Sequence, residues 1–476
     1  MRKNYGLNPA LTSLAFHPFD RENFDMTLHV GLCGAGIGGL AAAIAIAQCG
    51  ARVTVLEAAE ELGEIGAGIQ MTPNVARLLR RWEVDKVIGS NLVRYEELNL
   101  RRKDGTKIGW APMSRVEGTV GQPWWLVHRH HLHQGLVEVT RRNGCEIHIA
   151  SGVADIDHSR KSVAVKTTTG KKYTFDLLIG SDGIGSVTRR KLFPDVSPTP
   201  PSNDAAYRAI VPTEKVQADP VARELVQKHT MEVWMAHNAY IISYPISGGK
   251  DFNMVLNHEA DHPVTSVEEV DISEVREYYK DWDPRIKRIV DMVPSVQRWP
   301  LLVTGPLESW SSPQKNVVLM GDAAHSMVNH MAQGVATSME DGAFLGRCLR
   351  EVVRGRLAVA EAIGIYERAR MPLAHKKQQI SFLNGALWHL PDGAAQEARD
   401  GAMAAELKGE QLIRSPNLYA DPVTVWETYA YDAAQHAEDE LAKWFNEGKE
   451  PMDEETKVTR CEAYKFMDWC LGQSKL

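Results

Sequence analysis

The amino-acid sequence predicts an α/β fold with a discontinuous, Rossmann-like parallel-sheet domain, an inserted antiparallel β-sheet and a helical C-terminal region. Two observations support this prediction. An apolar strand at residues 28–33, a glycine-rich turn, an Ala-rich helix that ends at Gly50 and a strand at 53–56 form a βαβ unit. Buried strands recur much later, at 175–180 and 316–320, and the alternating segments between them are typical of an antiparallel sheet.

The glycine-rich turn has the spacing of a dinucleotide-binding fingerprint. Gly34 permits a tight turn, Gly36 lets the backbone approach a pyrophosphate, and Gly39 lets the helix pack closely on the strand. The N–H groups at the start of the helix then face the phosphates. Glu57 ends the second strand, where its carboxylate can accept a hydrogen bond from a ribose hydroxyl. A GxGxxG motif alone is weak evidence for a dinucleotide-binding site, but within a βαβ unit it is strong evidence.

The same stretch has a competing interpretation as a membrane span. Residues 26–51 contain no Lys, Arg, Asp or Glu and are long enough to cross a bilayer. Four glycines within six residues and the strand that follows favour the buried βαβ unit, so we expect no membrane span. Residues 1–25 are mixed in charge and contain prolines, unlike a secretory signal. We expect a flexible leader, with Met26 as an alternative start.

The composition excludes several classes of protein. A chain of 476 residues is long enough for two or three domains. Its formal net charge of −7 argues against nucleic acid as a partner. The six cysteines show neither metal nor disulfide spacing, which predicts a reducing compartment. They are Cys33, Cys49, Cys145, Cys348, Cys461 and Cys470.

The last three residues, Ser474, Lys475 and Leu476, form a motif of their own. A C-terminal Ser-Lys-Leu is the address that the peroxisomal import receptor reads. The alternative is the frayed end of a helix. We expect a peroxisomal location, and a cytoplasmic one otherwise.

Hydrophobic periodicity and turn residues predict the remaining elements. Asn74 to Val87 has the pattern of an amphipathic helix, and Tyr95 to Ile108 alternates around Lys103-Asp104-Gly105 as a hairpin does. The other expected elements are a helix at 132–142, short strands within 146–173, sheet strands at 207–211, 231–235, 239–246 and 252–257, and helices at 273–293, 333–350 and 424–446.

Three further segments make the general fingerprint specific. The first runs from Asp176 to Arg190 and contains Asp182-Gly183; the second runs from Gly321-Asp322-Ala-Ala-His325 to Gly342. The third is Glu64 to Gln70, together with Val127-His128-Arg129. In combination they resemble the single-component flavoprotein aromatic hydroxylases, which include salicylate, hydroxybenzoate and urate hydroxylases and fungal monooxygenases of phenolic natural products. The likeness covers about residues 28–375.

The resemblance implies bound FAD, a transient NADH or NADPH, and O2. It implies that Arg129 contacts FAD, that Asp182 serves both FAD and the nicotinamide, and that Asp322 accepts a hydrogen bond from a ribityl or ribose hydroxyl. Two backbone segments are expected against the isoalloxazine ring. They are Gly68-Ile69-Gln70 and Gly334-Val335-Ala336, the second with the positive end of a helix toward the ring.

The family that the sequence resembles hydroxylates through a flavin hydroperoxide, which attacks an electron-rich carbon. A phenolate is more nucleophilic than a phenol, so the protein is expected to stabilise the phenolate. Arg208, at the start of a sheet strand, supplies a permanent positive charge. Tyr240, on the same strand face as Tyr244, can donate to the same oxygen. We predict Arg208 and Tyr240 as the catalytic pair. The alternative for Arg208 is a surface or interface ion pair, and the alternative for Tyr240 is a half-buried tyrosine of the sheet.

Two positions depart from the family pattern. Salicylate-type relatives tend to have a histidine at the position of Tyr240, whereas a tyrosine resembles fungal phenol hydroxylases, including dearomatising ones. Asn329 and His330 stand where relatives usually have a proline beside the flavin, and His330 either lines the pocket or is a loop residue. The histidines at 128, 130, 131 and 133 do not have the spacing of metal ligands, so we expect no metal.

The pattern therefore predicts an FAD-dependent monooxygenase that uses NAD(P)H and O2 to hydroxylate a phenolic or hydroxybenzoate-type substrate, with decarboxylation or dearomatisation as variants. One alternative is an epoxidase or hydroxylase of an alkaloid or polyketide. Alternatives of other classes are a flavin oxidase or redox-responsive flavoprotein without oxygen insertion, and a membrane-anchored binding protein. The C-terminal helices either form a homodimer face or only pack on the molecule.

The expected organisation is discontinuous, with a boundary at the prolines between 194 and 201. The expected parts are a flexible leader at 1–25, an FAD-binding domain at 26–91, 121–200 and 305–375, a substrate-binding sheet domain at 92–120 and 201–304, and a helical C-terminal extension at 376–476.

Overall fold

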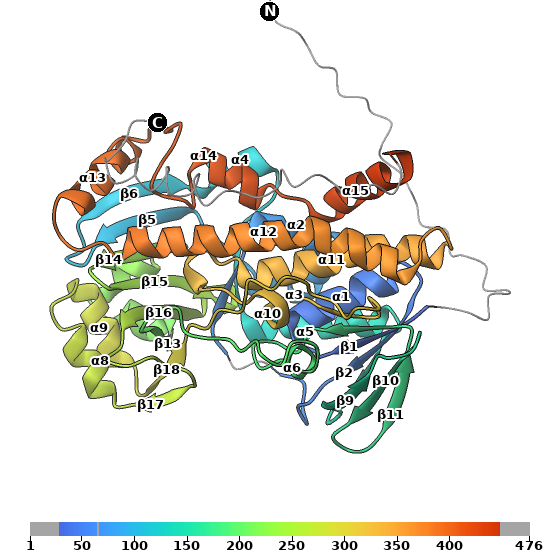
Figure 1. The fold of residues 1–476 in the computed structure, drawn as a ribbon. Coiled ribbons are helices and arrows are strands. Elements are labelled where there is room, and N and C mark those ends of the chain that lie inside the picture. Colours follow the sequence, from blue (N-terminus) through green and yellow to red (C-terminus); the bar gives the residue numbers. More distant parts are fainter. Residues whose placement is uncertain (1–27, 64–65, 448–476) are drawn as a thin grey trace, which may run out of the picture.

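The computed structural model describes residues 28–63 and 66–447 (Figure 1). A parallel sheet in the order β19-β12-β1-β2-β8 lies at the centre of one half of the molecule. Its middle strand β1 (His29–Cys33) pairs with β2 (Arg52–Leu56) and with β12 (Leu177–Gly180), while β8 (Glu146–His148) and β19 (Val317–Leu319) form the edges. Three distant parts of the chain thus build one sheet, which confirms the predicted α/β fold class.

Helix α1 (Ile37–Ala47) packs closely against α11 (Gly334–Val353). A Cβ atom on Gly342 of α11 would lie 2.7 Å from the Cα of Ala42, and one on Gly346 would lie 2.8 Å from a carbonyl oxygen of α1. Both distances are shorter than carbon atoms tolerate, so the two backbones approach this closely only because glycine lacks a side chain.

Two small sheets border the parallel sheet. They are formed by β9 (Val153–Asp157), β10 (Val163–Thr167) and β11 (Lys172–Phe175), and by β3 (Gly68–Met71), β4 (Val93–Arg94) and β7 (Trp125–His128). The accompanying helices are α2 (Pro73–Arg81), α3 (Val84–Ile88), α5 (Arg129–Arg142), α6 (Val187–Leu192) and α10 (Asp322–His325). The helix predicted at 74–87 is interrupted at Glu83, whose φ of 60° is left-handed.

The second large sheet has the strand order β17-β18-β13-β16-β15-β14-β5-β6. Its neighbouring strands are antiparallel, except that β14 and β5 run parallel. The bounds are β5 (Glu97–Arg102), β6 (Lys107–Pro112), β13 (Asp204–Pro212), β14 (Thr230–Ala236), β15 (Ala239–Ile246), β16 (Asp251–Glu259), β17 (Glu268–Val270) and β18 (Val296–Pro300). The hairpin predicted around Gly105 is β5-β6.

The two faces of this sheet have different partners. One face, with Tyr207 and Trp234, packs on α8 (Ile272–Tyr278) and α9 (Pro284–Met292). These two helices replace the single helix predicted at 273–293, because the Asp283 carboxylate caps α9. The opposite face carries Tyr240 and packs on C-terminal segments. The short elements at the margins are η1 (Gly89–Asn91), α4 (Met113–Val120), α7 (Thr213–Ala218), η2 (Ala222–Val226), η3 (Ser247–Gly249) and η4 (Asn329–Met331).

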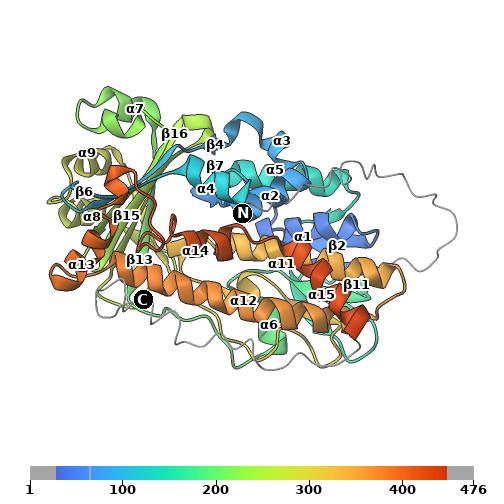
Figure 2. The same ribbon diagram turned by 90° about the horizontal axis from the view of Figure 1, so that it is seen from above.

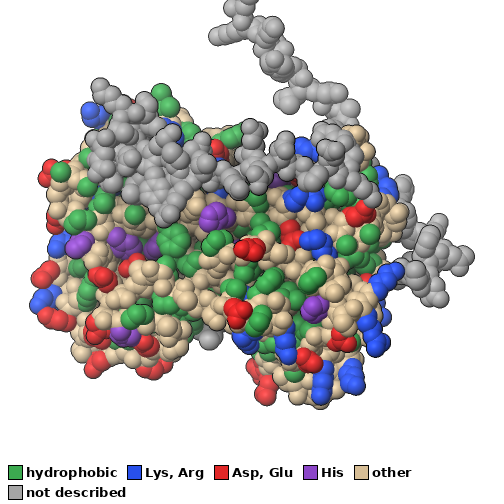
Figure 3. Space-filling view, viewed as in Figure 1, with side chains coloured by type: hydrophobic (Ala, Val, Ile, Leu, Met, Phe, Trp, Pro, Cys, Tyr) green, Lys and Arg blue, Asp and Glu red, His purple; other side chains and the backbone are tan. Residues whose placement is uncertain are grey.

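Helix α12 (Val359–Trp388) connects the two halves. Seen from above, it runs along the molecule from α11 and α15 to the large antiparallel sheet (Figure 2). The space-filling view shows a notch between the lobe with β17, β18 and α8 and the lobe with β9 to β11 (Figure 3). The remaining elements are α13 (Ala394–Met403), η5 (Glu406–Lys408), α14 (Pro422–Thr424), η6 (Val425–Tyr429) and α15 (Ala433–Glu447).

Some features predicted from the sequence lie in residues that the structure does not describe. The leader, Glu64, Cys461, Cys470 and the C-terminal Ser474 to Leu476 lie outside the described residues. Within 28–63 and 66–447, the helices lack the length and apolar character needed to cross a membrane. The four cysteines in these ranges, at 33, 49, 145 and 348, are free thiols.

We predict that Gly342→Ala lowers the free energy of unfolding by about 1–3 kcal/mol, because the new methyl group meets the backbone of α1. Denaturant unfolding followed by circular dichroism measures the change. Gly401→Ala in α13, where a Cβ meets no atom within 4 Å, is the control and should stabilise by roughly 0.5–1 kcal/mol. Unchanged stability of Gly342→Ala would contradict the close packing of α1 and α11.

Candidate active site

The turn between β1 and α1 leaves room for a ligand. Gly34 has a φ of 98°, and a Cβ on Gly39 would lie 2.2 Å from the Gly34 carbonyl oxygen, so both positions require glycine. A Cβ on Gly36 would instead meet open space. Among the described residues, no side chain caps α1. Its first N–H groups are therefore donors that suit a pyrophosphate beside Gly36.

Glu57 braces this turn. Its Oε2 accepts from the Ala35 N–H at 2.6 Å, and its Oε1 accepts from the Ala59 N–H at 2.8 Å. Each carboxylate oxygen can accept more than one hydrogen bond. Glu57 can therefore hold the turn and accept a ribose hydroxyl at the same time.

Asp182 holds the loop that follows β12. Its carboxylate accepts from the Thr188 N–H at 2.9 Å, from the Thr188 hydroxyl at 3.0 Å and from Ser186 Oγ. Buried Arg189 then donates to the carbonyl oxygens of Ile184 at 2.6 Å and Ala323 at 3.0 Å. The Asp182 side chain thus shapes a backbone loop, and Arg189, to which the sequence analysis gave no role, ties that loop to α10.

Asp322 begins α10 and lies beside the start of α11. Its Oδ1 is 4.0 Å from the point where a Cβ of Gly334 would lie. The side chain reaches the surface, and the protein packed around it raises the pKa of its carboxyl group, against the positive charges of His325, Arg129 and Arg189. In this position it suits a hydrogen bond to a ligand hydroxyl.

Gly334, Val335 and Ala336 form the first turn of α11. This turn contains no acidic residue and receives no side-chain hydrogen bond from the described residues, so its N–H groups remain available as donors. The preceding Gln333 turns its side chain inward, where Nε2 donates to Thr72 Oγ1 at 3.2 Å. The start of α11 can therefore face an electron-rich ring.

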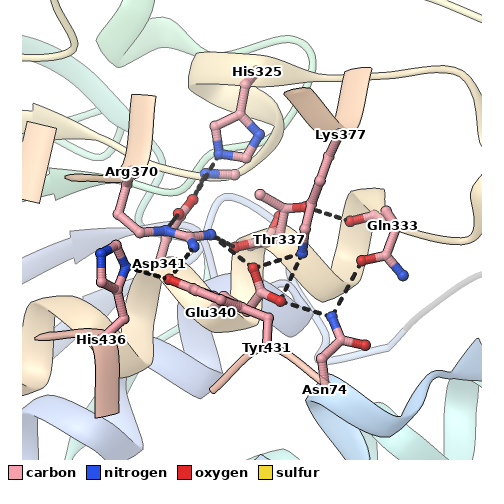
Figure 4. Close-up of polar contacts among 12 residues, drawn as sticks. Asn74, His325, Gln333, Thr337, Glu340, Asp341, Arg370, Lys377, Tyr431 and His436 are labelled. Atoms are coloured by element: carbon pink, nitrogen blue, oxygen red, sulfur yellow. Dashed lines mark hydrogen bonds and ion pairs between the residues drawn. The ribbon is translucent and has the colours of Figure 1, made fainter. Parts of the chain in front are cut away.

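Behind these loops lies a buried group of charged and polar side chains, which we call the carboxylate network (Figure 4). In it, Arg370 donates to Asp341 Oδ1 and to Glu340 Oε2, each at 2.9 Å. Lys377 Nζ lies 2.7 and 2.8 Å from the two oxygens of Glu340. The network consists of Asn74, His325, Gln333, Glu340, Asp341, Arg370 and Lys377.

The carboxylate network ends on the ligand-facing backbone. Asp341 Oδ2 accepts from the Gly321 N–H at 3.1 Å and lies 2.7 Å from His325 Nε2. Burial would raise the pKa of Asp341, but His325 and Arg370 outweigh it and lower the pKa. Asn74 Nδ2 bridges Glu340 at 2.7 Å and the Gln333 side chain at 3.2 Å. The network therefore fixes both the loop before Asp322 and the start of α11.

The β3 segment joins the two halves of the molecule. The Gly68 N–H donates to Asn253 Oδ1 at 2.7 Å, and a Cβ on Gly68 would lie 2.6 Å from Asn253 and from Tyr244. Ile69 is half-buried and Gln70 is buried. Glycine at 68 is thus required by contact with the antiparallel sheet.

Arg129 lies where α5 begins, and its N–H donates to the Ala67 carbonyl at 3.0 Å. Burial raises the pKa of Tyr244, and the charges of Arg208 and Arg129 oppose this shift. The positive charge of Arg129 also acts to lower the pKa of Asp322, so it acts both on the sheet and on the loop at α10.

The histidine run does not form a metal site in the described ranges, where no group of three or more ligand-type side chains could hold an ion. The rings of His128, His130 and His131 are 5.7 to 6.3 Å apart. His133 points elsewhere, with its Nε2 2.8 Å from the Ala35 carbonyl oxygen. His128 Nδ1 accepts from the His130 N–H and caps α5.

Arg208 lines a cavity of about 400 Å³. Its guanidinium carbon lies 4.8 Å from the centre of the Trp299 ring, which supports the guanidinium by a cation–π contact. The cavity is bounded on one side by Gly66 and Ala67, next to β3, and on the other by the sheet edge. Its sheet-edge residues are Arg208, Glu269, Ser295, Val296, Gln297 and Trp299.

Tyr240 lies on the same sheet face as Arg208. Arg208 pairs with Val255 and Val255 pairs with Ile242, so Tyr240, two residues before Ile242, points to the same side. Its side chain is 1% exposed, and its hydroxyl oxygen lies 3.2 Å from Asn329 Oδ1 and 2.9 Å from Nδ1 of His330. The direct substrate contact expected of Tyr240 stays a prediction, because its hydroxyl is occupied by protein groups here.

Known proteins of similar sequence bind FAD or are FAD-dependent monooxygenases and hydroxylases. A family model described as an FAD binding domain matches residues 27–381. The chain is 33% identical over 422 residues to the FAD-dependent monooxygenase OpS4 of Beauveria bassiana (strain ARSEF 2860), covering 87% of this chain and 97% of the relative. It is 32% identical over 384 residues to 3-hydroxybenzoate 6-hydroxylase 1 of Aquipseudomonas alcaligenes, covering 79% and 92%.

Solved structures agree with the fold. CtdE in complex with FAD and its substrate 4 has a TM-score of 0.76 with this protein at 22% identity, covering 88% of this chain and 98% of that one. At this level of identity the match supports the fold alone. The fold and family type expected from the sequence are thereby confirmed.

We predict that Lys377→Met costs about 3–5 kcal/mol of stability, because it leaves the buried Glu340 carboxylate with one counter-charge fewer. Lys376→Met is a matched control one residue away, since Lys376 forms an exposed pair with Glu427 and should cost less than about 1 kcal/mol. Denaturant unfolding gives both values. Equal losses of stability in the two variants would show that the buried ion pair contributes no more than the exposed one.

Proposed function

The chain belongs to the FAD-binding domain family, and we propose that this FAD-dependent monooxygenase uses NAD(P)H and O2 to hydroxylate a phenolic or hydroxybenzoate-type aromatic substrate. The observation that carries the proposal is Arg208, a fixed positive charge in a cavity between the sheet and the β3 segment. The activity named for the relative 3-hydroxybenzoate 6-hydroxylase 1 supports the same substrate class.

The residues present fit FAD. Open space at Gly36 beside the uncapped α1 suits the pyrophosphate, and the carboxylates of Glu57 and Asp322 suit hydroxyl groups. The uncapped start of α11 would stabilise negative charge on the ring system. FAD, when bound, supplies the chemistry that takes electrons from NAD(P)H and activates O2.

Arg208 would hold the substrate as a phenolate. Its charge is permanent, and an opposite charge within a few ångströms favours the ionised form of a phenol. The Trp299 ring keeps the guanidinium in place, so little side-chain entropy is lost when the anion binds. The ionised ring is then electron-rich at the carbons ortho and para to its oxygen, and hydroxylation is expected at one of these.

The size of the cavity bears on the substrate. A volume of about 400 Å³ lies in the range of small-molecule pockets, and Gly66 and Ala67 beside the cofactor-facing β3 segment line part of it. The cavity therefore admits a single-ring phenol as well as a larger one, and the alkaloid or polyketide epoxidase remains the second candidate. Oxygen uptake and product mass with 3-hydroxybenzoate, larger phenols, an alkaloid and a polyketide would separate the two candidates. If every turnover of the wild type gave hydrogen peroxide and no product gained oxygen, a flavin oxidase would replace both.

We predict that Arg208→Ala lowers kcat/KM for hydroxylation by roughly 10–100-fold, the effect of losing one hydrogen bond to a charged group. FAD should remain bound, as shown by the visible spectrum, because Arg208 lies on the sheet. Arg223→Ala, at an exposed position in η2, is the control and should behave like the wild type. Unchanged product formation by Arg208→Ala would remove its proposed role.

We also propose peroxisomal import through Ser474-Lys475-Leu476. A fluorescent protein fused to the N-terminus should give a punctate pattern that becomes diffuse when these three residues are deleted. The same puncta after the deletion would reject the motif. Whether the C-terminal helices form a homodimer face or only pack on the molecule stays open as in the sequence analysis; Phe382, Val423 and Trp426 are exposed apolar side chains in this region.

A further inference from the structure

The antiparallel sheet borders a second, smaller cavity on its other face, between the strands and the helices α8 and α9; we call it the apolar cavity. The centre of a water-sized sphere has about 10 Å³ in which to move there, so the cavity holds about one small molecule. Strands β13, β16 and β18 form one wall, and the segment with α8 and α9 forms the other. The lining residues are Ala209, Met254, Leu256, Ile272, Val275, Val290, Val293 and Val296.

Every side chain that lines the apolar cavity is apolar. Ala209 follows Arg208 on β13, so the two side chains point to opposite faces of the sheet. Ile272 is half-buried, and the other lining residues are buried. A water molecule inside would find no side-chain partner for its hydrogen bonds, and a cavity of this kind stays dry.

The apolar cavity and the cavity at Arg208 have one residue in common, Val296. The pairing of β13 with β18 ends at Arg208 and Gln297. The next residues along these two strands are Ala209 and Val296, and both line the apolar cavity. The two cavities therefore approach each other at the point where the sheet between β13 and β18 ends.

On the opposite side, Ile272 lies between the apolar cavity and the exterior. It is the first residue of α8 and packs against the core of this sheet face. Its neighbours Asp271 and Ser273 are exposed. The side chain of Ile272 is thus the thinnest part of the wall toward the solvent.

We propose that the apolar cavity binds dioxygen on its way from the solvent, past Ile272, to the cavity at Arg208, with Val296 at the passage between the two cavities. The inference rests on the proposed function, in which O2 is a reactant. Dioxygen is a small apolar molecule, so its transfer from water into an apolar space is favourable. NAD(P)H and aromatic rings are too large for this cavity, and water and hydrogen peroxide would lack hydrogen-bond partners in it.

Two substitutions fill the apolar cavity from opposite walls. Ala209→Val adds methyl groups on β13, and Val290→Leu adds a methylene group on α9. Because Val290 lies on a helix behind the sheet, the second variant leaves the neighbours of Arg208 on β13 unchanged. Ala222→Val and Val216→Leu are matched controls, since both residues are fully buried in the same core and lie outside the cavity lining.

The first measurement is the reaction of the reduced enzyme with O2. The FAD-loaded protein is reduced in the absence of O2 and then mixed with buffers of rising O2 concentration, without an aromatic substrate. The slope of the reoxidation rate against O2 concentration should fall about tenfold in the two filled variants, which corresponds to an added barrier of about 1.4 kcal/mol for moving packed methyl groups. It should stay unchanged in the controls. Anaerobic reduction by NADH or NADPH should be the same in all variants, whereas a general structural disturbance would slow both reactions.

The second measurement probes the site itself with xenon, an apolar atom that binds in dry cavities. Wild-type crystals under xenon pressure should show xenon among Ala209, Met254 and Val290, and crystals of the filled variants should not. No xenon in the wild type, an O2 slope that is unchanged in both filled variants, or an equal fall in the controls would overturn the proposal. If the slope falls only in the filled variants but no aromatic compound gains oxygen, the proposed hydroxylase function is rejected and the O2 site remains supported, because O2 is consumed in either case.

Discussion

The pairing of buried charges between α11 and α12 is the interaction on which the ligand-facing loops depend. Glu340 and Asp341 are fully buried carboxylates in the second turn of α11, and their charges are compensated by Arg370 and Lys377 of α12. A buried carboxylate without such partners would carry a desolvation cost of several kcal/mol. The pairing therefore holds α11 in one position, and with it the start of α11 and the loop before Asp322.

The C-terminal region completes this arrangement, although the sequence left its role open. The Tyr431 hydroxyl accepts from Arg370 Nη1 at 2.9 Å and so adds to the carboxylate network. Asp432 pairs with Arg81 of α2 at 2.9 Å, and Glu438 of α15 forms a bidentate pair with Arg350 of α11 at 2.7 and 2.8 Å. Residues after the family match thus brace the same helices as the matched part, which explains why α12 and α15 pack along α11.

The sequence predicted the elements that depend on a local residue pattern. It did not predict the features that depend on contacts between distant parts of the chain. The βαβ unit, the hairpin at Gly105 and the strand faces follow from periods of two and 3.6 residues and from glycine chemistry. The breaks at Glu83 and before Pro284 were missed, because amphipathic periodicity continues across both. Arg370 and Lys377 gave a weak signal: they lie seven residues apart, on one face of α12, amid apolar positions. Their partners on α11 can be identified only from the structure, which shows how α11 and α12 pack against each other.

The segment from Asn329 to Gln333 connects the sheet face near Tyr240 with the start of α11. At one end Asn329 and His330 lie on the sheet face, and at the other end Gln333 is bound into the carboxylate network at the start of α11. Between them Ala332 has a φ of 53°, a conformation that costs a non-glycine residue on the order of 1–3 kcal/mol and persists only where both flanks are held. The backbone between the sheet face and the start of α11 is therefore held in one conformation at both of its ends.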